Sequence, residues 1–296
     1  MRAVVTGGAG FIGSHVVDAL VERGDEVHVV DNFATGSREN VNAAATVHEQ
    51  DVREPLLDLF AEIRPELVAH LAAQADVGTS VEQPVLDAEV NVLGTLNVLE
   101  AARSHGAQLV FSSTGGAIYG ECDRPAREDD ERRPLSPYGT AKLAAEEYLR
   151  TWNRLYGSRH VALRFANVYG PRQLPKLEGG VVAIFIDRLR AGDGVTIFGD
   201  GAQTRDFVYV GDVVAAILAA VGREGGVFNV GTGTETSVDE LFAATRSVAG
   251  VDADAGYAPA RPGDVRRSVL DVSRAERELG WRAQTALVEG LRLTWG

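Results

Sequence analysis

Short apolar runs alternate with helical stretches through the first 165 residues, and this alternation constrains the fold more than any other feature of the sequence. The strand-like runs cover residues 3–5, 26–30, 46–49, 67–70, 109–111 and 161–164. The helix-like runs lie between them, at residues 12–23, 55–63, 84–104 and 138–156. Strands that alternate with helices form βαβ units with parallel strands, and strands that are apolar throughout are covered on both faces. The sequence therefore predicts an α/β fold with a doubly wound parallel sheet, the Rossmann arrangement.

The regular alternation of strands and helices ends after residue 165, which predicts a smaller C-terminal lobe beside the sheet domain. A loop rich in Pro and Gly spans residues 170–180, a helix is expected at 181–191, and strands are expected at 206–210 and 227–230. Asp212 is expected to cap a helix over residues 213–221, and the remainder is expected to form short elements and loops. We expect the Rossmann domain over residues 1–166, with strands from about 206–231 returning to it, and a lobe formed by residues 167–205 and 232–296.

Charge and composition narrow the range of partners. The 296-residue chain has a formal net charge of −13, with 45% hydrophobic and 24% charged residues, as in folded globular proteins. An acidic surface repels phosphate backbones, so we expect neither nucleic acid nor an anionic membrane as a partner. No histidine stands at metal-ligand spacing from another His, Cys or carboxylate, so no metal is expected. Cys122 is the single cysteine, which fits a reducing compartment, and we expect a cytoplasmic protein.

A glycine-rich turn after the first strand predicts a dinucleotide site. In VVTGGAGFIGSH, Gly7, Gly10 and Gly13 stand between a strand and a helix, where glycines permit close approach of the backbone to a pyrophosphate. The N-terminus of the following helix supplies N–H donors and a favourable dipole. Asp31 ends the second strand, where a carboxylate accepts hydrogen bonds from the adenosine ribose and repels a 2′-phosphate. The pattern therefore predicts NAD rather than NADP as the cofactor.

Tyr138 and Lys142 form a candidate catalytic pair in SPYGTAK. Their spacing of four places both side chains on one face of a helix. The pKa of a free tyrosine is ~10, so a nearby ammonium is needed to favour the phenolate at neutral pH. A tyrosine in this setting can act as a general acid and base toward a substrate hydroxyl. Ser112, Ser113 and Thr114 follow an apolar strand, at the edge of a parallel sheet where ligands bind, and Thr114 is expected to hydrogen-bond the same hydroxyl.

These motifs resemble the extended short-chain dehydrogenase/reductase family, and within it the UDP-glucose 4-epimerase group. The resemblance covers nearly all of the chain and is carried by TGGAGFIGSH, VVDNFATG, HLAAQADV, NVLGTLNVLEAA, FSSTGGAIYGE, SPYGTAK, RFANVYGPRQ, FGDGAQTRDFVYVGDV, FNVGTG and RPGDVRRS. It implies tightly held NAD and a nucleoside-diphosphate sugar. For this group it implies interconversion of UDP-glucose and UDP-galactose through oxidation at the sugar C4, rotation of the 4-keto sugar and return of the hydride to its other face.

The resemblance assigns roles to three sets of residues by position. The catalytic residues are Thr114, Tyr138 and Lys142. Besides Ser112, Tyr138 and Lys142, the residues expected to bind NAD are Gly7, Gly10, Phe11, Ile12, Gly13, Asp31, Asn32, Thr35, Gly36, Asp51, Val52, Leu71, Ala72, Ala73 and Asn91. Besides Thr114 and Tyr138, the residues expected to bind the substrate are Ser113, Asn167, Val181, Val182, Phe198, Arg205, Arg261, Asp264 and Ser268. The two arginines are expected to pair with the pyrophosphate.

The residues that follow Thr114 separate two reactions. Related 4,6-dehydratases and glucuronate decarboxylases have an acid-containing pair after the threonine, which helps to remove water or a proton once the keto sugar forms. Here Gly115, Gly116 and Ala117 follow, so no carboxylate is supplied and epimerisation is favoured. The segment TGGAIYG is one residue longer than the SATVYG form of some epimerases, so Ser113 stays open as an alternative to Thr114.

Several alternatives remain open at this point. They are a dTDP-sugar or UDP-glucuronate 4-epimerase, a 4,6-dehydratase, a 4-ketoreductase and a non-enzymatic NAD sensor. Leu174 and Asn167 stand where glucuronate epimerases tend to have Arg and Thr, which disfavours a uronic acid. Ser268 aligns with a position that is bulky in strict glucose/galactose enzymes, which adds the N-acetylhexosamine pair to the expected substrates. In the family the helices that correspond to 84–104 and 138–156 pair across a twofold axis, so a homodimer is expected.

Overall fold

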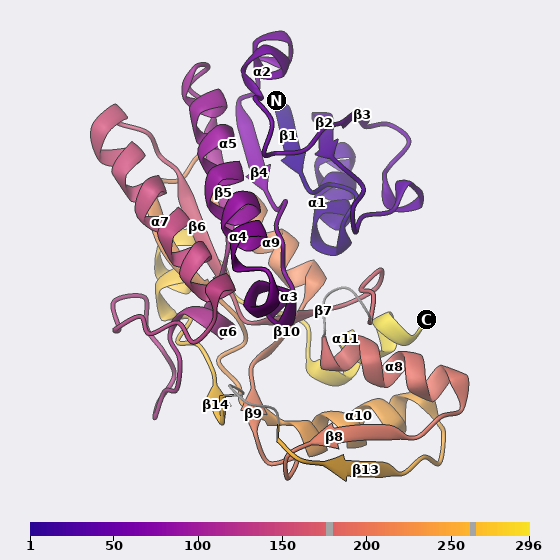
Figure 1. Ribbon diagram of the computed structural model, residues 1–296. Helices are drawn as coiled ribbons and strands as arrows, with labels where there is room; N and C mark the ends of the chain where they lie inside the picture. The colour runs from indigo at the N-terminus through magenta and orange to yellow at the C-terminus, as the bar shows by residue number, and fades with distance from the viewer. Residues whose placement is uncertain (176–179, 261–264) are drawn as a thin grey trace.

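A computed structural model describes residues 1–175, 180–260 and 265–296. In this part of the chain, seven parallel strands form the main sheet in the order β11-β6-β5-β4-β1-β2-β3 (Figure 1). They are β1 (Arg2–Thr6), β2 (Glu26–Asp31), β3 (Thr46–Glu49), β4 (Leu67–His70), β5 (Gln108–Thr114), β6 (Val161–Phe165) and β11 (Gly226–Val230). The strand order reverses between β1 and β4, which opens a crevice at their carboxyl ends. The predicted doubly wound sheet is confirmed.

Helices cover both faces of this sheet. One face carries α1 (Phe11–Glu22) and α9 (Val210–Ala220), and the other carries α2 (Leu57–Ile63), α5 (Gly94–Arg103) and α7 (Pro137–Tyr156) (Figure 1). Val5 lies in the core on the first face and its neighbour Val4 in the core on the second, and both are fully buried. Successive side chains of a strand thus enter two different cores, which explains the uniformly apolar strands. No helix in the described ranges combines the length and apolar character that crossing a bilayer requires.

The C-terminal part of the chain builds a lobe with its own core, below the sheet in Figure 1. Its helices are α8 (Val181–Ala191), α10 (Val238–Ala249) and α11 (Leu287–Trp295). Its strands are β7 (Asn167–Tyr169), β8 (Val195–Phe198), β9 (Thr204–Arg205), β10 (Phe207–Tyr209), β12 (Thr236–Ser237), β13 (Ala255–Ala258) and β14 (Arg267–Ser268). Phe185 and Phe242 meet edge to face in this core, with ring centroids 5.6 Å apart. Of the segment expected to return to the main sheet, β11 joins it, whereas β10 pairs with β7 outside it.

The helix expected at 84–104 is present and contains one π-helical turn. It consists of α4 (Pro84–Ala88), a π-helical turn (Glu89–Leu93) and α5, and α3 (Val77–Glu82) precedes it. The Thr95 hydroxyl donates to the carbonyl oxygen of Asn91 at 2.7 Å, and so competes for a backbone acceptor in the turn. The side chain of Asn91, in this turn, bonds both Asp87 in the preceding turn and the backbone of Gln74 outside the helix.

Two expectations for the second half are wrong. Asp212 does not cap α9, which begins at Val210; its carboxylate instead accepts the backbone N–H groups of Gln284 and Thr285, both at 3.0 Å. The segment expected to hold only short elements contains the twelve-residue helix α10. A capping box that starts at Ser237 begins this helix, because the Ser237 and Glu240 side chains each accept a backbone N–H of the other residue. The remaining elements are two short helices, Arg38–Asn40 and α6 (Gly115–Ile118), and a π-helical segment, Ala275–Leu279.

Candidate active site

The turn between β1 and α1 leaves no room for side chains at two of its glycines. Gly7 has a φ of +70°, and a Cβ there would lie 2.6 Å from the backbone nitrogen of Ala72. A Cβ on Gly13 would lie 2.0 Å from the carbonyl oxygen of Gly7. The first glycine therefore permits a left-handed backbone, and the other lets α1 pack directly against the turn. As a result, the N-terminus of α1 lines the cavity described below.

Asp31 ends β2 beside this turn and is held by two backbone donors. Its Oδ2 accepts the N–H of Ala9 at 2.9 Å, and its Oδ1 accepts the N–H of Phe33 at 2.8 Å. A carboxylate has about four acceptor positions, so about two remain for ribose hydroxyls. The residue is buried, and a 2′-phosphate placed against it would meet a negative charge shielded from water. This geometry favours NAD over NADP.

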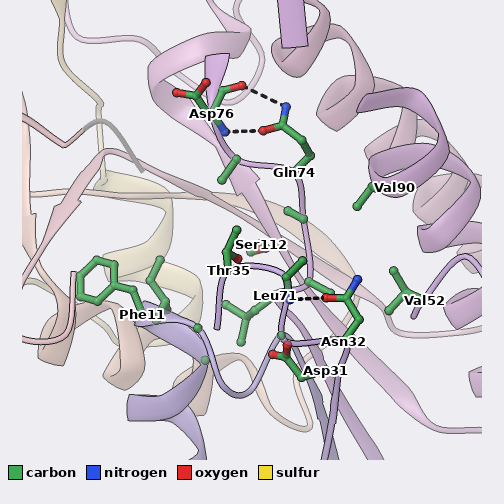
Figure 2. Close-up of a pocket in the computed structure, with 18 of the residues that line it drawn as sticks. Phe11, Asp31, Asn32, Thr35, Val52, Leu71, Gln74, Asp76, Val90 and Ser112 are labelled. Atoms are coloured by element: carbon green, nitrogen blue, oxygen red, sulfur yellow. Dashed lines mark hydrogen bonds between the residues drawn. The ribbon is translucent and has the colours of Figure 1, made fainter. Parts of the chain in front are cut away.

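A cavity of about 540 Å³ opens at the carboxyl ends of the central strands. Figure 2 shows Asp31 and Asn32 toward one end of it, Gln74 and Asp76 toward the other, and Ser112 between them. Its wall includes the following residues expected to bind NAD: Gly7, Gly10, Phe11, Ile12, Gly13, Asp31, Asn32, Thr35, Asp51, Val52, Leu71, Ala72, Ala73, Ser112, Tyr138 and Lys142. The glycine turn, the acid and the candidate catalytic pair thus share one cavity.

Two residues expected to bind NAD are not part of this wall. Gly36 packs against the glycine turn, where a Cβ would lie 2.8 Å from the Cβ of Ala9. Asn91 is buried and holds Gln74 from the π-helical turn: its side chain accepts the Gln74 N–H at 3.1 Å and donates to the Gln74 carbonyl at 2.9 Å. Both residues thus support the cavity wall without lining it.

Asp51 is fixed at the end of the cavity where Asn32 lies. The Arg53 side chain donates to both of its carboxylate oxygens, at 3.0 and 2.8 Å, and Asn32 Nδ2 donates to its Oδ2 at 2.8 Å. The hydrogen bonds from Arg53 lower the pKa of Asp51 to about 2, against the opposing effect of desolvation. The carboxylate is therefore ionised and rigidly oriented at neutral pH.

Tyr138 and Lys142 are presented by the first two turns of α7. Ser136 caps this helix by accepting the N–H of Gly139 at 3.2 Å. The Lys142 ammonium donates to the carbonyl oxygen of Ser112 at 2.9 Å and lies 5.9 Å from the centre of the Tyr138 ring. Lys142 is 2% exposed, and this burial lowers the pKa of its ammonium to about 8. The predicted pair is brought together, with its cation close to the ring.

Ser113 is part of the cavity wall, and its hydroxyl is bonded to a buried ion pair. Its hydroxyl donates to Oε1 of Glu146, one helical turn beyond Lys142, at 2.5 Å. The guanidinium of Arg164 donates to both oxygens of the same carboxylate, at 2.9 and 2.6 Å, and neither Glu146 nor Arg164 is exposed. The one proton of the Ser113 hydroxyl is therefore donated to Glu146.

Thr114 ends β5 and lies on the opposite side of the strand from Ser113. Its Oγ1 faces the same space as the side chain of Asn167, because a Cβ added to Gly116 would lie 3.9 Å from Thr114 Oγ1 and 3.6 Å from Asn167 Oδ1. Thr114 thus lies next to Asn167, another residue expected to bind the substrate, although it is not among the described residues that line the cavity.

The other residues expected to bind the substrate belong to the lobe. They are Asn167 at the start of β7, Val181 and Val182 at the start of α8, Phe198 at the end of β8, Arg205 in β9 and Ser268 in β14. Arg205 and Ser268 are register partners of adjacent strands, so they lie side by side. Val182 is 2% exposed and forms part of the lobe core. Arg261 and Asp264 lie outside the described residues.

The cavity wall also contains Gln74, Asp76 and Thr79, which the sequence analysis does not single out. Two hydrogen bonds join Gln74 to the backbone of Asp76, at 3.0 and 2.7 Å (Figure 2). Asp76 caps α3 by accepting the N–H of Thr79 at 2.7 Å. An Asp at the start of a helix is a recognisable N-cap signal, but α3 has only six residues and little periodicity by which to find it.

Comparison with known proteins shows which family has this combination of fold and site. Residues 3–231 match the NAD dependent epimerase/dehydratase family. The chain belongs to this family. The UDP-glucose 4-epimerase of Mycolicibacterium smegmatis is 46% identical over 304 aligned positions, which cover 99% of this chain and 97% of that one.

Solved structures of the epimerase/dehydratase family show the same fold. UDP-glucose 4-epimerase from Thermotoga maritima with UDP-glucose is 49% identical, with a TM-score of 0.98 and coverage of 100% of this chain and 97% of that one. UDP-glucose 4-epimerase from Thermus thermophilus in complex with NAD is also 49% identical, with a TM-score of 0.94 and coverage of 100% and 98%. The fold of this chain is therefore that of an epimerase of the extended short-chain dehydrogenase/reductase type.

The cavity fits the NAD on which this family depends. The turn at Gly7 and Gly13 leaves space that side chains would fill, and it presents N–H groups to a pyrophosphate. Asp31 retains acceptor positions for a ribose. When bound, NAD supplies a reversible hydride acceptor.

Proposed function

We propose that this protein is a 4-epimerase that interconverts UDP-glucose and UDP-galactose through a transient 4-keto sugar. The observation that carries the proposal is the cavity that unites the glycine turn with Tyr138 and Lys142, beside a strand end that offers Thr114 but no acid. Two relatives named for this activity match nearly the full length of the chain, which supports the proposal.

Tyr138 is the proposed general base and general acid at the C4 hydroxyl of the sugar. The ammonium of Lys142 favours the Tyr138 phenolate, which takes the hydroxyl proton as the C4 centre is oxidised. Thr114 hydrogen-bonds the same oxygen and orients it. After the keto sugar rotates, Tyr138 returns the proton to the C4 oxygen. Because the hydride removed from C4 also returns to C4, protons and electrons are both conserved over one cycle.

Gly115 and Gly116 occupy the positions where an elimination reaction needs an acid. A Cβ on Gly115 would lie 2.5 Å from Cδ1 of Leu270, so a side chain there would require that residue to move. A Cβ on Gly116 would make ordinary contacts and would face Thr114 and Asn167. A longer acid at 116 would thus point into the proposed sugar site, and the glycine present there supports epimerisation over 4,6-dehydration.

The proposal is tested with purified protein, UDP-galactose and no added cofactor, with the sugar followed by NMR. We expect UDP-glucose to form until an equilibrium mixture is reached, and the same mixture to form from UDP-glucose. Tyr138→Phe is the control, with a rate at least ~100-fold lower because the general acid–base group is lost. No conversion after NAD is supplied would discard the proposal, and accumulation of a 4-keto-6-deoxy sugar would assign a dehydratase.

We infer a wider substrate range from Ser268. Its side chain is small and lies beside Arg205, the arginine proposed to hold the pyrophosphate, so a bulky residue at this position would take up space next to that arginine. We therefore expect the N-acetylhexosamine pair to be interconverted as well, and Ser268→Tyr to remove that activity while it preserves hexose conversion. Failure of the wild type to act on the N-acetyl pair would refute this extension. Leu174 and Asn167, in place of Arg and Thr, support neutral sugars over uronic acids.

We also propose a cytoplasmic homodimer. The helices α4, α5 and α7 lie side by side on one face of the sheet (Figure 1). They and the intervening turn expose large apolar side chains, with Val85 71%, Leu93 54% and Leu155 66% exposed. Covering these side chains with a second copy would remove apolar surface from water. The single cysteine supports a reducing compartment.

A further inference from the structure

Asp87 is a buried acid that the proposed chemistry does not use. It lies on α4 and is 1% exposed. Its Oδ1 accepts hydrogen bonds from Gln74 Nε2 and Asn91 Nδ2, both at 2.9 Å. Its Oδ2 is buried and has no hydrogen-bond partner among the described residues. A buried carboxylate with only amide partners is costly unless a cation lies nearby.

Lys142 is that cation. It lies on α7, which packs against α4. Burial raises the pKa of Asp87, and its hydrogen bonds and the charge of Lys142 oppose this rise. Burial lowers the pKa of Lys142, and among the charges that counteract this effect Asp87 acts more strongly than Glu146. Each group thus stabilises the charged form of the other.

Three other titratable groups lie around Lys142, and they do not supply the negative charge that Asp87 supplies to its ammonium. Glu146, one turn along α7, is paired with Arg164 at 2.6 Å, so its charge is already compensated. His70, on β4, is completely buried, and this burial lowers its pKa to about 3, so the ring is neutral at physiological pH. Tyr138 is the group whose proton transfer the ammonium assists. Of the two carboxylates in the described part of the chain that act on Lys142, Asp87 is therefore the one whose charge is not already paired with an arginine.

We propose that Asp87 is a positioning residue for the proton transfer: its buried carboxylate keeps the Lys142 ammonium charged, and Gln74 and Asn91 hold the carboxylate in place. That Asp87 keeps the Lys142 ammonium charged does not depend on the proposed function. Only the purpose of this charge, which is to favour the Tyr138 phenolate, rests on the proposed function. The charge state of Lys142 is a property of the folded protein, so it can be measured without substrate. Removal of the negative charge should make Lys142 lose its proton at a lower pH.

The titration of Lys142 can be observed directly because the chain has only two lysines, Lys142 and Lys176. Protein labelled with ¹³C at the lysine Cε gives two signals, which Lys176→Arg assigns. We expect Lys142 to titrate near pH 8 in the wild type, and about one unit lower in Asp87→Asn. Asn keeps the size of the side chain and an oxygen for Gln74 and Asn91. An unchanged Lys142 titration in folded Asp87→Asn would overturn the proposal.

The same variant is then examined by its pH–rate profile. We expect the alkaline limb of kcat/KM to move to lower pH by the shift seen for Lys142. Asp58→Asn removes the same charge from an exposed site on α2 and should leave the profile unchanged. A fall in kcat at all pH values without a shift would mean that Asp87 is merely structural, and would contradict the proposal. An inactive wild type would refute the proposed function, while the lysine titration would still decide the role of Asp87.

Discussion

At the scale of single residues, two adjacent hydroxyls on β5 lie in different surroundings. Side chains alternate between the two faces of a strand. Ser113 therefore faces Glu146 and Arg164 in the core, whereas Thr114 faces the space beside Asn167. A shift of one residue would exchange them, which is why the longer TGGAIYG segment left the choice open in the sequence.

Substitution of the two hydroxyls should separate stability from catalysis. We expect Thr114→Val to lower kcat by ~100-fold, because a group that orients the reacting hydroxyl is lost. Ser113→Ala should leave kcat within a few-fold and reduce the free energy of unfolding by about 1–2 kcal/mol, because Glu146 loses a buried donor. Steady-state kinetics and urea unfolding measure the two effects. A larger kcat loss in Ser113→Ala than in Thr114→Val would reverse the assignment.

Residue spacing predicts the parts of the site that lie close together in the chain. The glycine turn, Asp31 and the four-residue spacing of Tyr138 and Lys142 are all readable in this way. The roles of Asp87 and Gln74 cannot be read from spacing. They depend on the packing of α4 against α7 and on the hydrogen bond from Gln74, in a loop, to Asp87 on α4. Neither of these contacts leaves a periodic signal in the sequence.

At the scale of elements, local hydrogen bonds lie at the places where the structure differs in detail from the prediction. The helix predicted at 84–104 forms, and its π-helical turn lies where the Thr95 hydroxyl donates to the backbone carbonyl of Asn91. Aspartate is a residue type that often caps helices, yet the Asp212 carboxylate accepts the backbone N–H of Thr285 instead. The Ser237–Glu240 capping box has the S-x-x-E pattern that marks the start of a helix, but α10 was not among the predicted helices.

The helical face that carries α5 and α7 makes a prediction about assembly. Leu155→Arg places a charge on the exposed apolar surface of α7, so we expect it to convert the dimer to monomer, as measured by light scattering during gel filtration. Leu293→Arg is the matched control, because Leu293 is 49% exposed on α11 in the lobe. A wild type that elutes as a monomer, or an unaffected Leu155→Arg dimer, would contradict this interface.

At the scale of the whole molecule, buried histidines make the fold sensitive to acid. Burial lowers the pKa of His160 to about 4, and its Nδ1 accepts the N–H of Leu109 at 3.0 Å. The pKa in the unfolded chain is ~6.5, so the unfolded state takes up the proton first as the pH falls. The stability present above pH ~6.5 is therefore lost progressively as the pH falls toward the folded-state value.

His160→Asn tests this source of acid sensitivity. Asn preserves an acceptor for the Leu109 N–H but cannot take up a proton in this range. Between about pH 7 and 5.5, we expect the unfolding free energy of the wild type to fall by ~1 kcal/mol more than that of the variant. Urea unfolding at each pH measures the difference. An equal decline in both proteins would show that His160 does not contribute.

The central claim concerns the whole catalytic cycle: the hydrogen removed from the sugar C4 returns to the same carbon, on its other face. The most direct measurement uses UDP-galactose with deuterium at C4, in ordinary water, with NAD at no more than the protein concentration. We predict UDP-glucose that retains deuterium at C4, in an equilibrium mixture with the starting sugar. Loss of deuterium to water, accumulation of reduced cofactor in proportion to product, or no product at all would contradict it.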